Sequence, residues 1–270
     1  MKTLMAVVVL LAALSVQAED DDMQKYLRDT QTLVDQGFYQ GALDRFLWFH
    51  DHALEHAPAM SGVRLSFALS LWKDLGNLYP PALAAMKKVR DDKTTLLEAG
   101  KGRRDLFADV MALNRTLGEE GKTVDLFRKL DQTQADLATA CWDYAADSVI
   151  KAKGYDLAKK YRWSPIQAFD RAREYYSLLM LRNVPKSATQ TVGGVNVVEP
   201  EVQTHIDSLK AHAETWFVEE SLRLMDVAVA MDDPKAAREI QAKALAVLDD
   251  PRLRDAVPQE KKPDAPPQGK

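Results

Sequence analysis

The chain has 270 residues, of which 46% are hydrophobic and 28% charged, and its formal net charge at pH 7 is −4. This length is ample for a large core in one or two domains, and the mildly acidic balance without a basic block argues against nucleic acid as a partner, because backbone binding needs concentrated Lys and Arg. A single cysteine, Cys141, excludes an intrachain disulfide, so packing has to supply the stability.

Residues 1–18 have the layout of a cleavable secretory signal peptide. Lys2 gives a positive start, Leu4 to Leu14 is almost purely apolar, and small residues end at Ala18 before an acidic stretch that begins at Glu19. The apolar run is shorter than the roughly 20 residues that a membrane-spanning helix needs. We therefore expect a mature chain that is periplasmic or secreted and has no transmembrane segment after cleavage. An uncleaved N-terminal anchor is the alternative.

Residues 19–250 show helical periodicity, and we expect them to form one helical repeat domain. Apolar residues at spacings of three and four mark helix faces that pack against a core. The three clearest stripes are Tyr39, Ala42, Leu43, Phe46, Phe49, His50, Ala53, Leu54 and Ala57; Leu137, Ala140, Cys141, Tyr144, Ala145, Ser148, Val149 and Ala152; and Ile206, Leu209, Ala213, Trp216, Phe217, Glu220, Leu224, Val227, Ala228 and Met231. Glycine and proline mark the breaks, which leaves roughly ten helices with short connections.

A repeat pattern emerges when these breaks are aligned. The segment Gly37-Phe-Tyr39-Gln-Gly-Ala42-Leu-Asp-Arg-Phe46 has the form G-x-Y-x-x-A-x-x-x-F. It resembles the join between the two helices of a tetratricopeptide (TPR) unit, in which glycine closes the first helix and the aromatic residue and the alanine pack the second helix against it. The resemblance implies an all-α fold of antiparallel helix pairs, stacked as a TPR-like α-solenoid or a compact helical array.

Weaker echoes of this pattern follow along the chain. The alanine-like positions are Ala42, Ala82, Val124, Ala158 and Ala237, which are separated by 40, 42, 34 and 79 residues. Helix-pair repeats have periods in this range, and the last gap is close to two units. The later echoes fit generic helical hairpins as well. The stretches Gly62–Trp72 and Ala244–Leu253 are similar to segments of uncharacterised exported bacterial TPR-containing proteins, which implies a helical fold and no particular activity.

Two segments differ from the helical body in composition. Residues 187–200 form the one long non-helical stretch, and such loops are often functional or mobile. This segment is either a flexible insertion between two helices or a small hairpin, with strands at 191–192 and 195–198 around Gly193-Gly194. Residues 251–270 are rich in proline and polar residues, which predicts a disordered tail.

One catalytic motif occurs literally, at His52-Ala-Leu-Glu55-His56. It has the H-x-x-E-H form of inverzincin metalloproteases, in which two imidazoles one helical turn apart hold Zn²⁺ and a carboxylate takes a proton from the bound water. A zinc-dependent hydrolase using His52, Glu55 and His56 is therefore the alternative function.

The helical pattern around this motif favours a different interpretation. His52 falls outside the apolar stripe of its helix and His56 at the edge, where solvated side chains belong, whereas His50 lies inside the stripe and is expected to pack. The third ligand would have to come from a downstream glutamate, and none is distinctive among Glu98, Glu119 and Glu120. We expect surface histidines, no catalytic residues, no metal and no cofactor.

The remaining candidates are a thiol, two glycine pairs and the aromatic residues. Cys141 lies on an apolar stripe, which predicts a buried, inert thiol. Gly100-Lys-Gly102 and Gly193-Gly194 match neither a P-loop nor a dinucleotide fingerprint. Most aromatic residues should fill the seams between repeats, while others could line a groove in which Arg64, Arg115 or Arg171 clamps a carboxylate of a bound peptide.

We therefore expect a protein that works by binding a protein or peptide partner, as a scaffold or adaptor, and that is not an enzyme. Solenoids expose an extended surface that suits such partners, although fold analogy alone does not establish binding. A purely structural role in the cell envelope is a third possibility. The sequence identifies neither the partner nor the residues that contact it.

Overall fold

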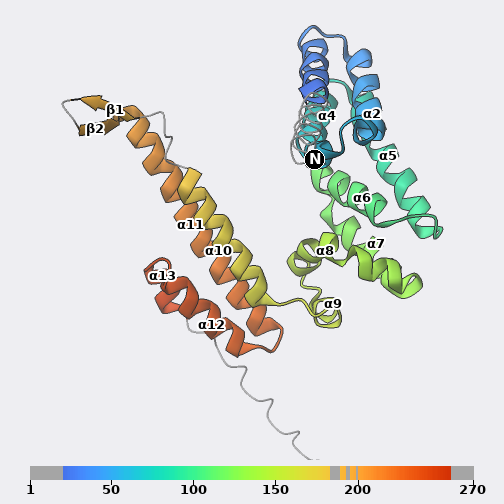
Figure 1. The fold of residues 1–270 in the computed structure, drawn as a ribbon. Coiled ribbons are helices and arrows are strands. Elements are labelled where there is room, and N and C mark those ends of the chain that lie inside the picture. Colours follow the sequence, from blue (N-terminus) through green and yellow to red (C-terminus); the bar gives the residue numbers. More distant parts are fainter. Residues whose placement is uncertain (1–20, 183–188, 193–194, 199, 257–270) are drawn as a thin grey trace, which may run out of the picture. The chain divides into compact units, whose positions relative to one another are not determined.

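The computed structural model describes residues 21–182, 189–192, 195–198 and 200–256, and most of these are helical. The prediction of an all-α array of packed helices is confirmed (Figure 1). The array falls into two compact units, of which the first ends at Gly154 and the second begins at Tyr155. Within the described residues, no helix combines the length and the apolar composition that crossing a bilayer requires.

Unit 1 is a stack of helices between residue 21 and Lys151. A helix over residues 21–35 is followed by α2 (Tyr39–His56), the 3-10 helix η1 (Pro58–Met60), α3 (Ser61–Arg64), α4 (Phe67–Leu78), α5 (Pro80–Glu98), α6 (Arg104–Leu117), α7 (Glu120–Thr133) and α8 (Ala135–Lys151). Beyond sequence neighbours, α4 packs against α6, α5 against α7, and α6 against α8. Such next-but-one packing arises when helix pairs stack on one another, as in a helical repeat fold.

The helix over residues 21–35 and α2 form the first pair, joined at Gly37. The chain folds back there, and Arg45 of α2 donates a hydrogen bond from Nε to the Thr30 hydroxyl oxygen at 2.9 Å. Its guanidinium also lies 3.8 Å from the centre of the Tyr26 ring. Gly37 has a φ of +80°, the left-handed conformation that commonly ends a helix. The predicted role of Gly37 in closing the first helix is confirmed.

The predicted apolar stripes form core faces, two of them only in part, since Leu209 in the stripe from Ile206 to Met231 is 38% exposed. On α2, the buried members are Ala42, Leu43, Phe46, Phe49, His50 and Ala53. On α8, Cys141, Ala145 and Val149 are buried, whereas Ala140 and Ala152 are exposed, so the stripe was predicted too wide.

Helices α4 and α5 cross closely because Gly76 has no side chain. A Cβ atom at Gly76 would lie only 3.0 Å from the Cβ of Leu83 on α5. Trp72, which is buried on α4, donates from its indole N–H to the Ala82 carbonyl at 3.0 Å. The two helices are thereby held in one register, and α4 presents its opposite side to the helix over residues 21–35.

Unit 2 is built on two long helices. Its elements are α9 (Tyr155–Lys160), α10 (Pro165–Arg182), β1 (Thr189–Val192), β2 (Val195–Val198), α11 (Pro200–Ala230), α12 (Pro234–Leu245) and α13 (Pro251–Asp255). Helix α11 packs against α10 and α12. The Phe217 ring lies 4.6 Å from that of Tyr176 and 5.9 Å from that of Phe169, which places an aromatic core between α10 and α11. The long helix predicted around Ile206 to Met231 is confirmed.

The two segments with unusual composition have partly regular structure. Strands β1 and β2 pair antiparallel with Val192 opposite Val195, so the hairpin interpretation of the 187–200 segment is confirmed for these strands. The rest of that segment lies outside the described residues. Helix α13 occupies 251–255, and its Leu253 is completely buried, so this part of the predicted tail is folded. The predicted signal peptide at 1–18 and residues 257–270 of the predicted tail lie outside the described residues.

Candidate binding groove

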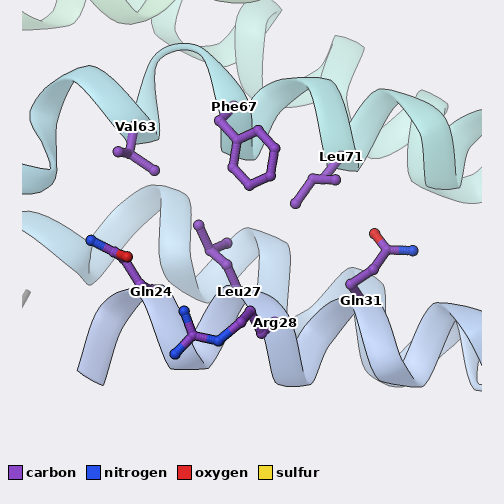
Figure 2. Close-up of a pocket in the computed structure, with 7 residues that line it drawn as sticks. All are labelled: Gln24, Leu27, Arg28, Gln31, Val63, Phe67 and Leu71. Carbon is purple, nitrogen blue, oxygen red and sulfur yellow. The ribbon is translucent and has the colours of Figure 1, made fainter. Parts of the chain in front are cut away.

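An apolar groove of about 430 Å³ lies in unit 1 between the helix over residues 21–35 and the segment formed by α3 and α4. Figure 2 shows side chains from both walls converging on it. One wall is purely apolar, and the other has a buried leucine at its base and polar groups along its edge. The lining residues are Val63, Phe67 and Leu71 on the first wall and Gln24, Leu27, Arg28 and Gln31 on the second.

The groove exists because α4 carries apolar residues on two of its faces. Ala68, Leu69 and Trp72 point into the core of unit 1 and are at most 5% exposed. Phe67 lies on the other face, and 57% of it is exposed. Burying a phenylalanine side chain fully is worth about 1.5–3 kcal/mol. The groove therefore offers apolar surface whose burial by another molecule would be favourable.

The edge of the groove carries one cation, Arg28, which forms no direct pair among the described residues, although its charge, after the hydrogen bond from Lys25, helps to lower the pKa of the neighbouring Asp29. The Arg28 guanidinium makes no hydrogen bond and no ion pair with any other part of the chain that the structure describes. Its neighbours are paired, because Lys25 contacts Asp29 at 2.8 Å and Gln31 donates to Asp35 at 3.0 Å. Arg28 is thus available to an anionic group of a bound molecule.

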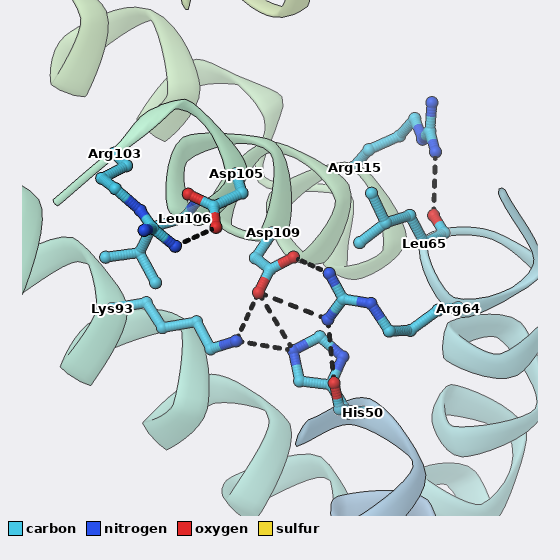
Figure 3. A network of polar contacts seen from close by, with 9 residues as sticks. All are labelled: His50, Arg64, Leu65, Lys93, Arg103, Asp105, Leu106, Asp109 and Arg115. Carbon is cyan, nitrogen blue, oxygen red and sulfur yellow. Dashed lines mark hydrogen bonds and ion pairs between the residues drawn. The ribbon is translucent and has the colours of Figure 1, made fainter. Parts of the chain in front are cut away.

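A buried polar network anchors the apolar wall of the groove (Figure 3). Arg64, which follows Val63 on α3, donates from Nη1 to the His50 carbonyl on α2 at 2.8 Å and forms an ion pair with Asp109 of α6. Lys93 of α5 donates to the same carboxylate, and its Nζ lies 3.0 Å from His50 Nε2. The network therefore ties α3 to three other helices.

The charges in this network set the protonation of its members. Burial alone would raise the pKa of Asp109, but hydrogen bonds and charge from Arg64 and Lys93 reverse this effect and hold that pKa below its usual value. Burial, reinforced by the charge of Lys93, lowers the pKa of His50 to about 3, so this imidazole is neutral at pH 7. His50 Nδ1 and Arg64 Nε are buried without a hydrogen-bond partner. The arrangement is suited to holding helices together and leaves no ionised imidazole for chemistry.

The HxxEH residues lie on the surface of α2. His52 Nδ1 is 3.1 Å from Glu55 Oε2, and these side chains are 46% and 68% exposed. The imidazoles of His52 and His56 lie 5.5 and 5.3 Å from the Trp48 ring. As the helical pattern predicted, both are surface residues, whereas His50 is buried.

Among the residues that the structure describes, none of the candidate glutamates joins these two imidazoles as a third ligand. Of the candidate glutamates, Glu98 pairs with Lys129 at 2.8 Å, Glu119 with Arg90 at 2.7 Å, and Glu120 with Lys151 at 3.5 Å. In the described ranges, no three side chains of His, Cys, Asp or Glu are grouped so that they could hold a metal ion.

The other predicted site residues are dispersed. Arg64 is buried in the polar network, Arg115 donates to the Leu65 carbonyl at 3.2 Å, and Arg171 is an exposed residue of unit 2. None of the three lines the groove of unit 1. Cys141 is buried, and burial raises the pKa of its thiol to about 11, as expected for an inert cysteine. Among the aromatic residues, Phe49, Trp72, Trp142 and Tyr176 fill seams, whereas Tyr175 is 52% exposed.

Sequence reasoning missed the groove, although one signal was available. Val63, Phe67 and Leu71 recur every four residues, beside the buried stripe of Ala68 and Trp72. A helix with two adjacent apolar stripes has more apolar surface than one core face needs, which is the pattern expected of a helix that also faces a partner.

No family model matches the sequence, and neither the curated proteins nor the solved structures include a significant match to this chain.

Proposed function

We propose that this chain is an exported, TPR-like helical-repeat protein that binds a segment of a partner protein in the groove of unit 1. The observation that carries the proposal is Phe67, which lies on the apolar wall of the groove and is 57% exposed instead of packing into the core. Exposed apolar surface of this kind is typical of interaction sites, because a bound molecule that covers it removes the unfavourable contact with water.

The position of the groove supports the TPR-like interpretation. Its walls are the first helix of the unit that matches the TPR pattern and the segment that leads into the next helix pair, α4 and α5. Next-but-one contacts between helices are what stacked repeats produce, and stacked repeats present neighbouring helices side by side as a continuous binding surface. Binding a protein segment on such a surface would require no catalytic group, metal or cofactor.

The experiment is affinity capture from a cell-envelope extract with three forms of the full chain, as the cell processes it. They are the wild type, Phe67→Asp in the groove, and Phe38→Asp as the matched control, since Phe38 is 62% exposed in the same unit but does not line the groove. Mass spectrometry should identify a protein that the wild type and Phe38→Asp capture and that Phe67→Asp loses. Identical captured sets for all three forms would overturn the proposal.

The export part of the proposal has its own test. Amino-terminal sequencing of the purified protein should give Glu19 as the first residue, because the apolar segment ends in the small residues that signal peptidase recognises. A chain that begins at Met1 and stays with the membrane would instead support the uncleaved anchor.

A further inference from the structure

We propose that the groove takes a short amphipathic α-helix of the partner that carries an aspartate or glutamate facing Arg28. This inference rests on the proposed function and specifies the chemistry of the partner. It depends on three properties of the groove, namely the spacing of its walls, their helical backbone and its one unpaired cation.

The spacing of the walls favours a helical occupant. Phe67 and Leu71 lie about one turn apart on α4, and Val63 precedes them on α3, on the other side of the break at Leu65 and Ser66. Gln24, Arg28 and Gln31 run in the same direction along the opposite wall (Figure 2). A third helix laid between these two ridges would place apolar side chains at positions i, i+4 and i+7 against Phe67 and its neighbours, which is the usual geometry of a helix bound in a groove.

The walls offer little to an extended peptide. Both are helices, whose interior backbone N–H and C=O groups are already paired within the helix, so neither provides the free edge to which a β-strand would add. Recognition must then come from side chains, as it does for amphipathic helices.

The charge of the groove favours an acidic occupant. Its lining contains one cation, Arg28, and no carboxylate. Two acids on the same helix, Asp29 and Asp35, are paired with Lys25 and Gln31 instead. A guanidinium can form two parallel hydrogen bonds with one carboxylate, which fixes the orientation of the bound helix as well as adding attraction. The carboxamides of Gln24 and Gln31 accept or donate on either side of this pair.

The test uses helix-forming peptides displayed on phage, selected on the full chain and counter-selected on Phe67→Asp. Recovered sequences should carry two or three apolar residues at helical spacing and an acidic residue about one turn from them. The best peptide is then synthesised with Glu, Gln or Lys at the acidic position, and fluorescence anisotropy measures its affinity for the wild type, Arg28→Gln and Arg28→Glu. Lys25→Gln is the matched control, because Lys25 lies on the same helix but outside the groove.

The wild type and Lys25→Gln should bind the Glu peptide about fivefold more tightly than the Gln peptide, the scale of one partly exposed ion pair. Arg28→Gln should lose that preference, and Arg28→Glu should prefer the Lys peptide. Peptides that depend on Phe67 but show no preference for Glu would overturn the acidic helix and leave the proposed function standing. This inference would be overturned if no recovered peptide depended on Phe67, or if a second copy of the chain occupied the groove. The proposed function is tested separately, by the capture from envelope extract.

Discussion

The Arg64 guanidinium and the Asp109 carboxylate form an ion pair inside unit 1, with 8% and 7% of their side chains exposed, although 45 residues separate them in the sequence. The pair joins α3, which carries one wall of the groove, to α6. Lys93 adds a second positive charge to the same carboxylate. Removing the shared anion would leave two cations in a region with little water, which is far more costly than breaking a surface pair.

The substitution Asp109→Asn should therefore lower the free energy of unfolding by about 3–5 kcal/mol, the cost of leaving a buried charge uncompensated. Urea denaturation followed by circular dichroism measures this change. Asp105→Asn is the matched control on the same helix, because Asp105 and its partner Arg103 are 66% and 84% exposed, and its denaturation midpoint should stay close to that of the wild type. Equal effects of the two substitutions would contradict a buried pair.

The stability of unit 1 should fall as the pH falls from about 6.5 towards 3, because of His50. The folded-state pKa of this imidazole is lowered to about 3, so unfolded chains bind a proton in this window that folded chains do not. The effect should reach about 2 kcal/mol at pH 5. It vanishes above about pH 7.5, where the imidazole is neutral in both the folded and the unfolded state.

Wild type and His50→Gln, compared by urea denaturation at several pH values, test this dependence. His50→Gln should remove most of the decrease in the free energy of unfolding between about pH 6.5 and pH 5. His52→Gln, at an exposed position, should retain this decrease. The groups that face His50 are Lys93, Asp109 and Arg64, and the lowered pKa of Asp109 adds a separate loss only near pH 4 and below. An unchanged pH profile in His50→Gln would show that His50 is not the titrating group.

Gly37→Ala should destabilise the protein by about 1 kcal/mol, because Gly37 has a φ of +80° and a Cβ atom is disfavoured in that conformation. Apart from Gly37 and its two chain neighbours, no described heavy atom lies within 4 Å of the position that this Cβ would occupy, so the backbone conformation causes the loss. Gly121→Ala makes the comparison, since Gly121 lies inside α7 with equally open space, and alanine should stabilise the helix there. Thermal unfolding midpoints that move in the same direction for both variants would contradict this account.

The helices could be predicted from the sequence because their signals are local. The stripe on α2 and the glycine that closes the preceding helix are fixed by residues within a few turns of one another. The groove could not, because Val63, Phe67 and Leu71 have the spacing of an ordinary core stripe, and only the position of the helix over residues 21–35 decides that Phe67 stays exposed.

The buried network was missed for a related reason. Arg64, Lys93 and Asp109 are of residue types that normally face solvent, and charged residues are seldom buried unless they are paired. Their pairing is created by the packing of α3, α5 and α6, which no local pattern encodes. The sequence therefore suggested Arg64 as a clamp for a bound peptide, whereas the structure gives that role no support and leaves Arg28 as the accessible cation at the groove.

The zinc content of the purified protein tests the alternative reading of His52, Glu55 and His56. We expect well under one equivalent of zinc after dialysis of protein made without a histidine tag. The reasons are that the Glu55 carboxylate already contacts the His52 imidazole, and that the candidate third ligands Glu98 and Glu119 form ion pairs with Lys129 and Arg90. Stoichiometric zinc that disappears in His52→Ala and His56→Ala would restore the hydrolase hypothesis.

Phe67→Ala should change the free energy of unfolding by less than about 1 kcal/mol, because most of this side chain is already in contact with water. Phe107→Ala is the matched comparison, since Phe107 of α6 is completely buried, and its removal should cost about 3–5 kcal/mol. Calorimetric or chemical unfolding of both variants gives the two values. If Phe67→Ala is well tolerated but abolishes partner capture, the residue is retained for binding and not for folding, as expected where function exposes a side chain that stability alone would bury. A loss of stability similar to that of Phe107→Ala would instead assign Phe67 to the core.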